Sequence, residues 1–301
     1  MESTIKREQY TQSHPPIIPQ SYPWLVIRDG KHLERQKIFN ISKNKYYSIT
    51  IPEMHNKMIC TSTNEWLLLN DLDSKDLSLL NLLSMEVVQL PRLESFTNSD
   101  VCILCPPTSE SNQDCYVMII DRSPCKFYFC QPGDEEFSEQ EFEFDLEEQE
   151  YEFGAMCISA ATMEDFPRPS PPEIPTTNDY LIESGGELLY IHKMRGGWDA
   201  KMILGFIILR MNFLRQAWEE VNNIGGWTLF LSQDRGLEHK AISCFAAEGV
   251  KQNSIYFTKP FDRFYYVFDL ENNSISKSLP CPTVSKFMSR LDWVLIPITK
   301  S

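Results

Sequence analysis

The chain has 301 residues, of which 42% are hydrophobic and 23% are charged. Such a chain can bury a sizeable core, and its composition excludes a wholly disordered or collagen-like protein. The formal net charge of −14 argues against binding to nucleic acid or to an anionic membrane surface. Much of this charge is local, because 11 acidic residues and no basic one lie between Asp134 and Glu152. We interpret this acidic stretch as a solvated face, with docking of a basic partner as the alternative.

The first 20 residues are polar and include Pro15, Pro16 and Pro19, so we expect 1–20 to be a flexible tail. We expect 21–301 to form a single domain. The sequence shows no apolar core of a secretory signal and no run of about 18 apolar residues that could span a membrane. The nine cysteines are an odd number, which together with the missing signal indicates a reducing compartment. The sequence therefore predicts a location in the cytoplasm, the nucleus or both.

Short apolar segments separated by turn signals follow from Tyr22 onwards and predict an all-β first half. In the segment EFEFDL, apolar side chains alternate with acids, which is typical of a half-buried strand. The predicted strands of this half lie at 37–41, 45–51, 58–61, 65–71, 77–84, 86–91, 101–105, 115–121, 126–134 and 141–146.

A proline-rich segment at 164–179, interpreted as a loop or linker, precedes a second half of the same kind. The predicted strands of this half lie at 179–184, 187–194, 203–211, 227–232, 241–246, 254–258, 265–270 and 292–297. Asn272-Asn273 is a hairpin signal after the strand at 265–270. Turns with positive φ angles are predicted at the glycine pairs Gly185-Gly186, Gly196-Gly197 and Gly225-Gly226. None of these pairs belongs to a phosphate-binding motif.

The segment 210–221 leaves two interpretations open. Apolar residues recur there at the spacing of an amphipathic helix, at Met211, Leu214, Trp218 and Val221. Elsewhere a strand begins about every ten residues, which predicts a sandwich, a barrel or a propeller. Weak self-similarity with a period of about 40–50 residues favours the propeller. A propeller commonly closes by pairing strands from its two ends, and the apolar runs at 24–27 and 293–296 are the candidates.

Eight segments of the sequence resemble segments of a known family. In the first half they are PWLVIRDGKH, KYYSITIPEM, STNEWLLLND and LSLLNLLSMEVVQLP. In the second half they are YLIESGGELLYIHK, AWEEVNNIGGWTLFLS, NSIYFTKP and YYVFDLENNSI. Their order and spacing resemble the plant kelch-like propellers of the KIB type, known as domain of unknown function 295, from about Pro23 to Pro297. The resemblance implies an all-β, kelch-like propeller of four-stranded blades, and it favours a hairpin through Trp218 over the helix.

Two regions depart from that family. Most members carry an N-terminal F-box, a three-helix module that docks on the Skp adaptor of a cullin ubiquitin ligase. Only about 20 residues precede Pro23, so the comparison implies that the F-box is missing and that direct binding to the Skp adaptor is not expected. The strand pair that usually joins the two halves is replaced by residues 151–173, which implies a shortened or irregular blade in the middle.

The resemblance implies a protein-interaction module, similar to the target-binding part of plant F-box proteins, that acts as a monomer on an unidentified protein partner. Loops from several blades form a rim that suits the recognition of a folded protein. The alternative is a propeller-based enzyme, isomerase- or cyclase-like, that acts on a small plant metabolite in the channel mouth. A structural remnant without activity is a third interpretation. We favour the interaction module over the enzyme and assign no catalytic residue.

Five cysteines invite a zinc or redox interpretation, namely Cys102, Cys105, Cys115, Cys125 and Cys130. However, VCILC has the composition of a strand, which would point Cys102 and Cys105 to opposite faces. We therefore interpret these cysteines as buried strand residues and predict neither a metal site nor a cofactor. No metal-ligand spacing or catalytic pattern occurs among the histidines, which are His14, His32, His55, His192 and His239.

Overall fold

The structure, a computed structural model, is built almost entirely of strands. It describes residues 22–63, 66–97, 100–105, 116–121, 126–141, 179–196, 202–215, 217–233, 239–259, 262–281, 283 and 290–295. In these ranges 21 strands form five sheets, and one short 3-10 helix, η1 (Pro52–Met54), precedes the second sheet. No described helix has the length and apolar character that a bilayer crossing requires.

Four of the sheets have four antiparallel strands each. The first sheet contains β21 (Arg290–Val294), β1 (Trp24–Asp29), β2 (Arg35–Asn40) and β3 (Lys45–Ile49). The second sheet contains β4 (Lys57–Ser62), β5 (Trp66–Asp71), β6 (Leu77–Asn81) and β7 (Val87–Gln89). The third sheet contains β8 (Val101–Cys105), β9 (Tyr116–Asp121), β10 (Lys126–Cys130) and β11 (Ser138–Glu141). The fourth sheet contains β12 (Asp179–Ser184), β13 (Glu187–Gly196), β14 (Met202–Asn212) and β15 (Ala217–Val221).

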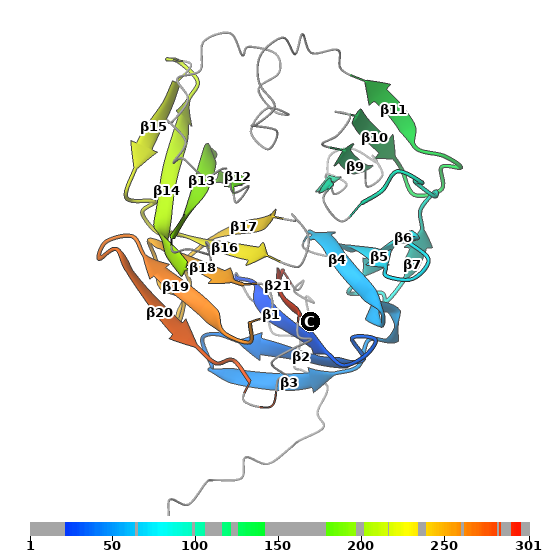
Figure 1. Cartoon of the computed structure of the whole chain (residues 1–301), viewed down its shortest axis with the longest axis horizontal. Helices are drawn as coiled ribbons and strands as arrows, with labels where there is room; N and C mark the ends of the chain where they lie inside the picture. The colour runs from blue at the N-terminus through cyan, green and yellow to red at the C-terminus, as the bar shows by residue number, and fades with distance from the viewer. Residues whose placement is uncertain are drawn as a thin grey trace, which may run out of the picture.

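The fifth sheet has five strands, which are β17 (His239–Phe245), β16 (Trp227–Gln233), β18 (Ser254–Thr258), β19 (Tyr265–Asp269) and β20 (Ser274–Ser278). Here β16 and β18 run parallel, because β17 first forms a hairpin on the other edge of β16. Figure 1 shows the five sheets arranged as the blades of a ring, with β21, β4, β12 and β17 toward its centre. The predicted all-β propeller is confirmed, and the fifth sheet departs from the predicted four-stranded blade by one strand.

Both faces of a sheet are buried against its neighbours, as the central strand β5 shows. Leu67, Leu68 and Leu69 are all at most 1% exposed. Because successive side chains of a strand point to opposite faces, Leu67 and Leu69 pack with Val26 of the first sheet, while Leu68 packs with Leu104 of the third. Burial on both faces explains why the strands have continuous apolar runs instead of strict alternation.

A repeated turn connects strands within the sheets and accounts for part of the self-similarity in the sequence. Between β5 and β6, Asp71 Oδ1 accepts the backbone N–H groups two and three residues further on, at 2.9 and 3.0 Å. Between β6 and β7, Asn81 Oδ1 does the same at 2.8 and 3.0 Å. Lys75 and Met85 then adopt φ angles of 66° and 60° at matching positions. The β19–β20 turn begins in the same way, with Asp269 Oδ1 accepting the N–H of Glu271 at 3.0 Å.

The ring closes where β1 pairs with β21, so the predicted pairing of the two ends is confirmed. The two strands are antiparallel, with Leu25 opposite Trp293. The Trp293 ring lies 5.0 Å from Phe230, 6.2 Å from Tyr256 and 5.9 Å from Tyr265, measured between ring centroids. The closing strand thus carries an aromatic side chain into the apolar layer between the first and fifth sheets.

The segment 210–221 forms the hairpin of β14 and β15, so the helical interpretation is wrong and the hairpin favoured by the family resemblance is confirmed. Trp218 pairs across the hairpin with Met211. Pairing with β13 on the other side of β14 holds the segment in the sheet and overrides its helical spacing.

The glycine pairs were predicted only in part. Gly185, Gly186 and Gly225 have positive φ angles, whereas Gly226 and Gly196 do not. Gly196 ends β13 instead of forming a turn, because its backbone still pairs with Met202 of β14.

Several predictions fall on residues outside the described ranges. These are the tail at 1–20, Gly197, the proline-rich loop except for Asp179, the irregular middle blade expected from 151–173, and the strand at 141–146 beyond Glu141.

Candidate functional site

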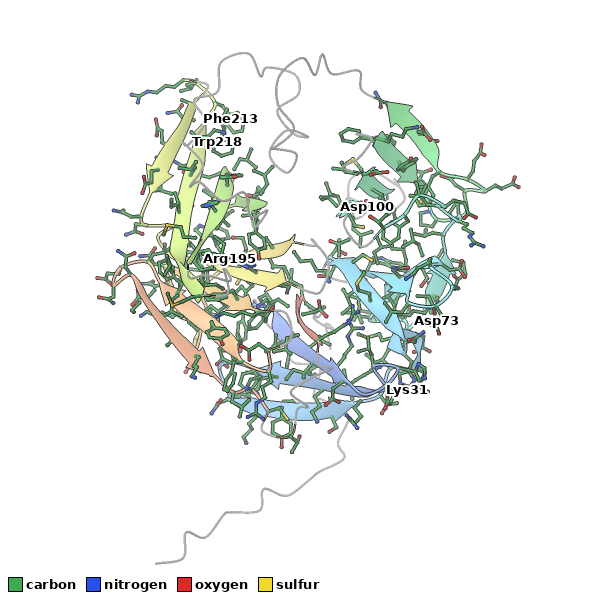
Figure 2. All side chains as sticks on the ribbon, in the orientation of Figure 1. Lys31, Asp73, Asp100, Arg195, Phe213 and Trp218 are labelled. Atoms are coloured by element: carbon green, nitrogen blue, oxygen red, sulfur yellow. The ribbon has the colours of Figure 1, made fainter. Side chains whose placement is uncertain are left out.

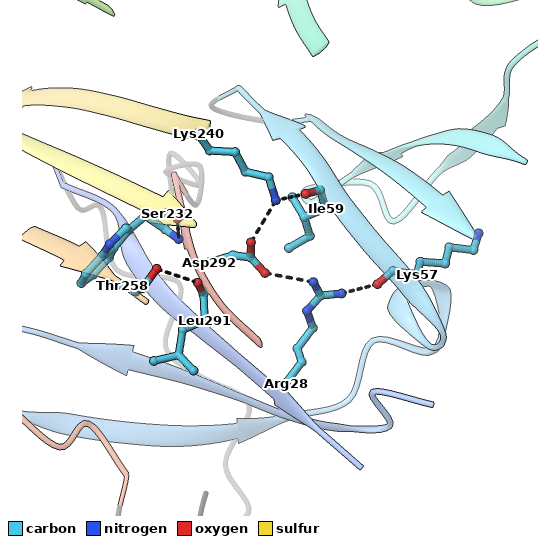
Figure 3. Close-up of polar contacts among 9 residues, drawn as sticks. Arg28, Lys57, Ile59, Ser232, Lys240, Thr258, Leu291 and Asp292 are labelled. Carbon is cyan, nitrogen blue, oxygen red and sulfur yellow. Dashed lines mark hydrogen bonds and ion pairs between the residues drawn. The ribbon is translucent and has the colours of Figure 1, made fainter. Parts of the chain in front are cut away.

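Three charged side chains meet where the first, second and fifth sheets come together (Figure 3). Asp292 on β21 accepts a hydrogen bond from Arg28 Nη2 on β1 at 3.0 Å and another from Lys240 Nζ on β17 at 3.0 Å. Arg28 Nη1 also donates to the carbonyl oxygen of Lys57 on β4 at 2.5 Å, and Lys240 Nζ donates to the carbonyl oxygen of Ile59. We call Arg28, Lys240 and Asp292 the central ionic cluster, and it connects strands of three sheets.

Because this cluster is buried, each of its charges is stabilised by the opposite charge beside it and not by water. Arg28 is 0% exposed and Asp292 is 2% exposed. Burial alone would raise the pKa of Asp292, but the charges and hydrogen bonds of Lys240 and Arg28 outweigh it and lower the pKa to about 2. Asp292 is therefore ionised at neutral pH. Removing one partner of such a buried pair typically costs about 3–5 kcal/mol, so the cluster holds the three sheets in place.

The central ionic cluster also bears on the enzyme alternative, which requires ionisable groups that can reach a ligand. Both carboxylate oxygens of Asp292 are bound by cations of the chain itself. Lys240 is 12% exposed, and its ammonium group is shared between Asp292 and a backbone carbonyl. Because the charged groups of this cluster bind one another and backbone carbonyls, they link the sheets. The cluster therefore does not favour an enzymatic interpretation.

The β14–β15 hairpin presents apolar side chains to solvent at its tip. Leu214 is 99% exposed and Phe213 is 67% exposed. Figure 2 shows Phe213 and Trp218 together at the outer end of this hairpin. Apolar groups gathered in this way on a surface are typical of a contact site for another molecule.

Polar contacts fix the shape of the tip. Asn212 Oδ1 accepts the backbone N–H of Arg215 at 3.1 Å, and Asn212 Nδ2 donates to Glu219 Oε1 at 2.8 Å. Arg215 Nη1 lies 3.3 Å from the same carboxylate oxygen, and Arg210 Nη2 lies 3.6 Å from the other. The hydrogen bond from Asn212 is the main cause that lowers the pKa of Glu219, which keeps this carboxylate ionised. A tip held in one shape loses less conformational entropy on binding than a mobile loop.

An aromatic pair supports the hairpin behind its tip. The rings of Trp218 on β15 and Tyr190 on β13 have centroids 5.9 Å apart. Both side chains are half-buried, as is Met211 opposite Trp218. The exposed tip therefore continues into a partly covered apolar surface on the same sheet.

Three of the five cysteines that were predicted to be buried strand residues lie on described strands, and among them Cys130 is buried while Cys102 is half-buried. Cys102 and Cys105 belong to β8, and Cys102 pairs with Ile119 of β9. Cys130 ends β10 and lies buried in the apolar cluster between the second and third sheets. Cys115 and Cys125 lie outside the described ranges. Among the side chains that the structure describes, none form a group of three or more metal-ligating residues.

The histidines are dispersed over the fold. His192 is half-buried within β13, where a structural histidine was expected. His32 lies in the turn between β1 and β2, and His55 follows η1. His14 and the side chain of His239 lie outside the described part of the chain.

The described part of the acidic stretch lies at the outer edge of the third sheet. Glu135 and Glu136 are exposed before β11. Glu139 Oε1 on β11 forms an ion pair with Lys126 Nζ on β10 at 2.5 Å. Residues 142–152 are not described. This exposure fits the interpretation as a solvated face.

Sequence reasoning missed both the central ionic cluster and the exposed tip. A signal for the cluster exists, because Arg28 and Asp292 are charges set within the apolar runs at the two ends of the propeller. Such a charge must find a partner when its strand is buried. For Leu214 the pattern misled, since helical spacing would have placed this side chain on the buried face.

Comparisons with known proteins agree with this architecture. A family model described as the KIB1-4 beta-propeller matches residues 38–278, a range that includes strands of all five sheets. Over 109 residues the chain is 32% identical to F-box only protein 7 from Arabidopsis thaliana. This alignment covers 36% of the chain and 26% of the relative, so the chain matches about a quarter of the length of that curated protein.

Proposed function

Because the chain belongs to the KIB1-4 beta-propeller family, we propose that it recognises another folded protein and that the tip of the β14–β15 hairpin makes the contact. The observation that carries this proposal is the exposure of Leu214 and Phe213 on a turn fixed by hydrogen bonds. A partner with an apolar pocket would remove both side chains from water.

The energetics of such a contact are favourable. Burying a leucine or phenylalanine side chain contributes roughly 1.5–3 kcal/mol each. Arg215 and Glu219 flank the apolar pair and supply the polar rim that surrounds the anchor residues of many interfaces. The preformed turn limits the entropy lost on binding.

The relationship to F-box only protein 7 supports a finer proposal. We infer that this kelch-like ring serves target recognition, in a role similar to that of the propeller part of plant F-box proteins. In this role the ring holds the hairpin rigidly, and the hairpin selects the partner.

The test compares partner binding by the full chain and by the double variant F213A/L214A. Proteins captured from a plant cell extract by the wild-type chain are purified, and their affinities for both chains are measured. We expect the double variant to bind the specific partner about tenfold more weakly or worse, because the anchor side chains are lost.

The matched control is M202A/L204A, which removes two other exposed apolar side chains from the opposite end of β14. This control should keep the affinity of the wild-type chain. Equal affinities for wild type and F213A/L214A, with melting temperatures unchanged, would contradict the proposal.

A further inference from the structure

An exposed aromatic side chain lies on the fifth sheet, beside the turn between β12 and β13. Phe245 ends β17, is 63% exposed and pairs with Trp227 of β16. The two rings pack edge to face, with centroids 5.8 Å apart and an interplanar angle of 85°. A Cβ at Gly226 would lie 2.5 Å from the Phe245 ring. A Cβ at Gly185 would lie 2.6 Å from the Trp227 ring. The aromatic pair is thus held closely between two glycines, which fixes Phe245 while its ring stays open to solvent.

Phe245 and the tip of the β14–β15 hairpin lie at the same end of their sheets. The strands β12 and β14 run in the same direction, because each pairs antiparallel with β13. Ser184, the last residue of β12, therefore lies at the same end of the fourth sheet as the tip. Ser184 Oγ is 2.5 Å from Ser243 Oγ, which is two residues before Phe245 on β17.

The spacing of the strands allows one partner to reach both features. Neighbouring strands are about 4.8 Å apart, so β12 and β14, which have β13 between them, are about 10 Å apart. A typical contact surface of about 800 Å² per partner is about 30 Å across. Such a surface spans Phe245 at one side and the hairpin tip at the other.

The turns beside Phe245 leave room for this partner, and two carboxylates flank them. Gly186 and Gly225 are exposed, and a Cβ at either position would meet nothing within 4 Å. Glu183 lies just before the β12–β13 turn, and Glu248 follows Phe245 by three residues. Both glutamates are exposed, and within the described residues neither forms an ion pair. This part of the surface is therefore low, apolar at Phe245 and negatively charged at its sides.

We propose that Phe245 is a second anchor for the protein that the hairpin tip recognises, and that this partner carries basic side chains around its apolar contact surface. The inference rests on the proposed function of the hairpin. Aromatic side chains near the middle of an interface often contribute most of its binding energy. The open turn at Gly186 lets the partner approach the backbone between the two anchors. Lysine or arginine side chains of the partner would complement Glu183 and Glu248.

The first test is photo-crosslinking in a plant cell extract, with full chains that carry p-benzoylphenylalanine in place of Phe245 or of Leu214. Met202→p-benzoylphenylalanine is the matched control, because Met202 is 58% exposed at the opposite end of β14. We expect positions 245 and 214 to crosslink the same protein, identified by mass spectrometry, and position 202 not to crosslink it. Excess wild-type chain should suppress the crosslink from position 245, whereas the same concentration of F245A should not.

The second test measures the affinity of that purified protein for variants of the full chain. G186N adds a side chain where the partner should lie, and asparagine tolerates a positive φ angle. G133N is its control in the β10–β11 turn, since Gly133 also has a positive φ angle and a Cβ there would meet nothing within 4 Å. We expect F245A and G186N to bind about tenfold more weakly than wild type, and G133N to bind within about twofold of it.

A third variant tests the charge of the partner. E183Q/E248Q should bind about threefold more weakly than wild type at low ionic strength, and this difference should shrink as salt is added. An unchanged affinity at low ionic strength would overturn the basic character of the partner.

These outcomes separate the second anchor from the function on which it rests. If the partner crosslinks from position 214 but not from position 245, or if F245A and G186N bind as G133N does, the second anchor is overturned and the hairpin proposal stands. If no protein crosslinks from position 214, the proposed function is contradicted and this inference with it. If F245A does not fold, G186N carries the binding test, since Gly186 has no neighbour that a Cβ would meet.

Discussion

At the level of single residues, Asp292 links the closing strand β21 to β1 of its own sheet and to β17 of the fifth sheet. Its two oxygens bind Arg28 and Lys240, which come from β1 and β17. In a buried environment with low effective dielectric, loss of the carboxylate would leave two cations facing each other without water. The ionised carboxylate of Asp292 is therefore required for β1, β17 and β21 to pack together.

We expect the variant D292N to lower the free energy of unfolding by about 3–5 kcal/mol, because it leaves Arg28 and Lys240 uncompensated. Chemical denaturation monitored by circular dichroism measures this change. The control D76N alters an exposed aspartate in the β5–β6 turn and should change stability by less than about 0.5 kcal/mol. Similar stabilities for the two variants would show that the central ionic cluster contributes little.

The lowered pKa of Asp292 also predicts how stability depends on pH. Its pKa in the folded chain is about 2, below the value of about 3.9 in an unfolded chain. The stabilisation is thus complete above about pH 4 and is lost as the pH falls toward the folded pKa. In K240M one cation is missing, so the folded pKa should rise and acid unfolding should begin at a higher pH. An acid midpoint of K240M that coincides with that of the exposed control K45M would contradict this account.

At the level of elements, the β12–β13 hairpin shows how a turn is tied to the neighbouring sheet. Gly185 has a φ angle of 63°, and a Cβ at this position would lie 2.6 Å from the ring of Trp227 on β16. Gly186 has a φ angle of 83°, but a Cβ there would meet nothing within 4 Å. A side chain at Gly186 would therefore meet backbone strain alone, whereas a side chain at Gly185 would also disturb the contact between the fourth and fifth sheets.

We expect G186A to lower stability by about 1 kcal/mol, the cost of a positive φ angle in alanine. G185A should cost roughly 1–3 kcal/mol more, because its methyl group displaces Trp227 from the junction between the sheets. Thermal unfolding of the two variants, with tryptophan fluorescence to follow Trp227, measures both effects. Equal destabilisation would mean that Trp227 moves aside without cost.

Most strands could be predicted from the sequence, because apolar runs bounded by polar turns are local signals. The β19–β20 hairpin was predicted from Asn272-Asn273, and Asn273 indeed has a φ angle of 49°. The segment 210–221 could not be settled by its own pattern, because pairing of β14 with β13 decides its conformation. The number of strands in the fifth sheet, five instead of four, could not be predicted either, since no local signal reveals that β18 pairs with β16 in parallel.

At the level of the whole molecule, closure of the ring depends on β21. Trp293 and Val294 are buried there, and β21 supplies the main-chain partner of β1. Burying such a strand contributes several kcal/mol at about 25 cal/mol per Å² of apolar area. Without it, β1 would present an unpaired and apolar edge.

Deletion from Leu291 onward should therefore give aggregated or proteolysed protein, whereas deletion of residues 1–20 should leave the fold intact. Soluble yield and melting of the two truncated chains, compared side by side, measure this difference. A chain that ends at Arg290 and still melts cooperatively would show that β21 does not close the ring.

Contacts between distant parts of the chain mark the limit of prediction from sequence. The pairing of β1 with β21 was predicted because a propeller must protect its edges, and this rule needs no detailed geometry. The bond between Arg28 and Asp292 joins residues that are 264 positions apart, and only the folded ring brings them together. Leu214 is likewise exposed because it lies at a hairpin tip, whereas its apolar character alone would predict burial.

The central claim, protein recognition through the β14–β15 hairpin, is tested most directly by photo-crosslinking. The substitution Leu214→p-benzoylphenylalanine is introduced into the full chain, which is irradiated in a plant cell extract. Leu83→p-benzoylphenylalanine, in the exposed β6–β7 turn, is the control. We predict a discrete crosslinked protein from position 214 that excess wild-type chain suppresses and excess F213A/L214A does not. Identical crosslinks from positions 214 and 83, or suppression by both competitors alike, would contradict the claim.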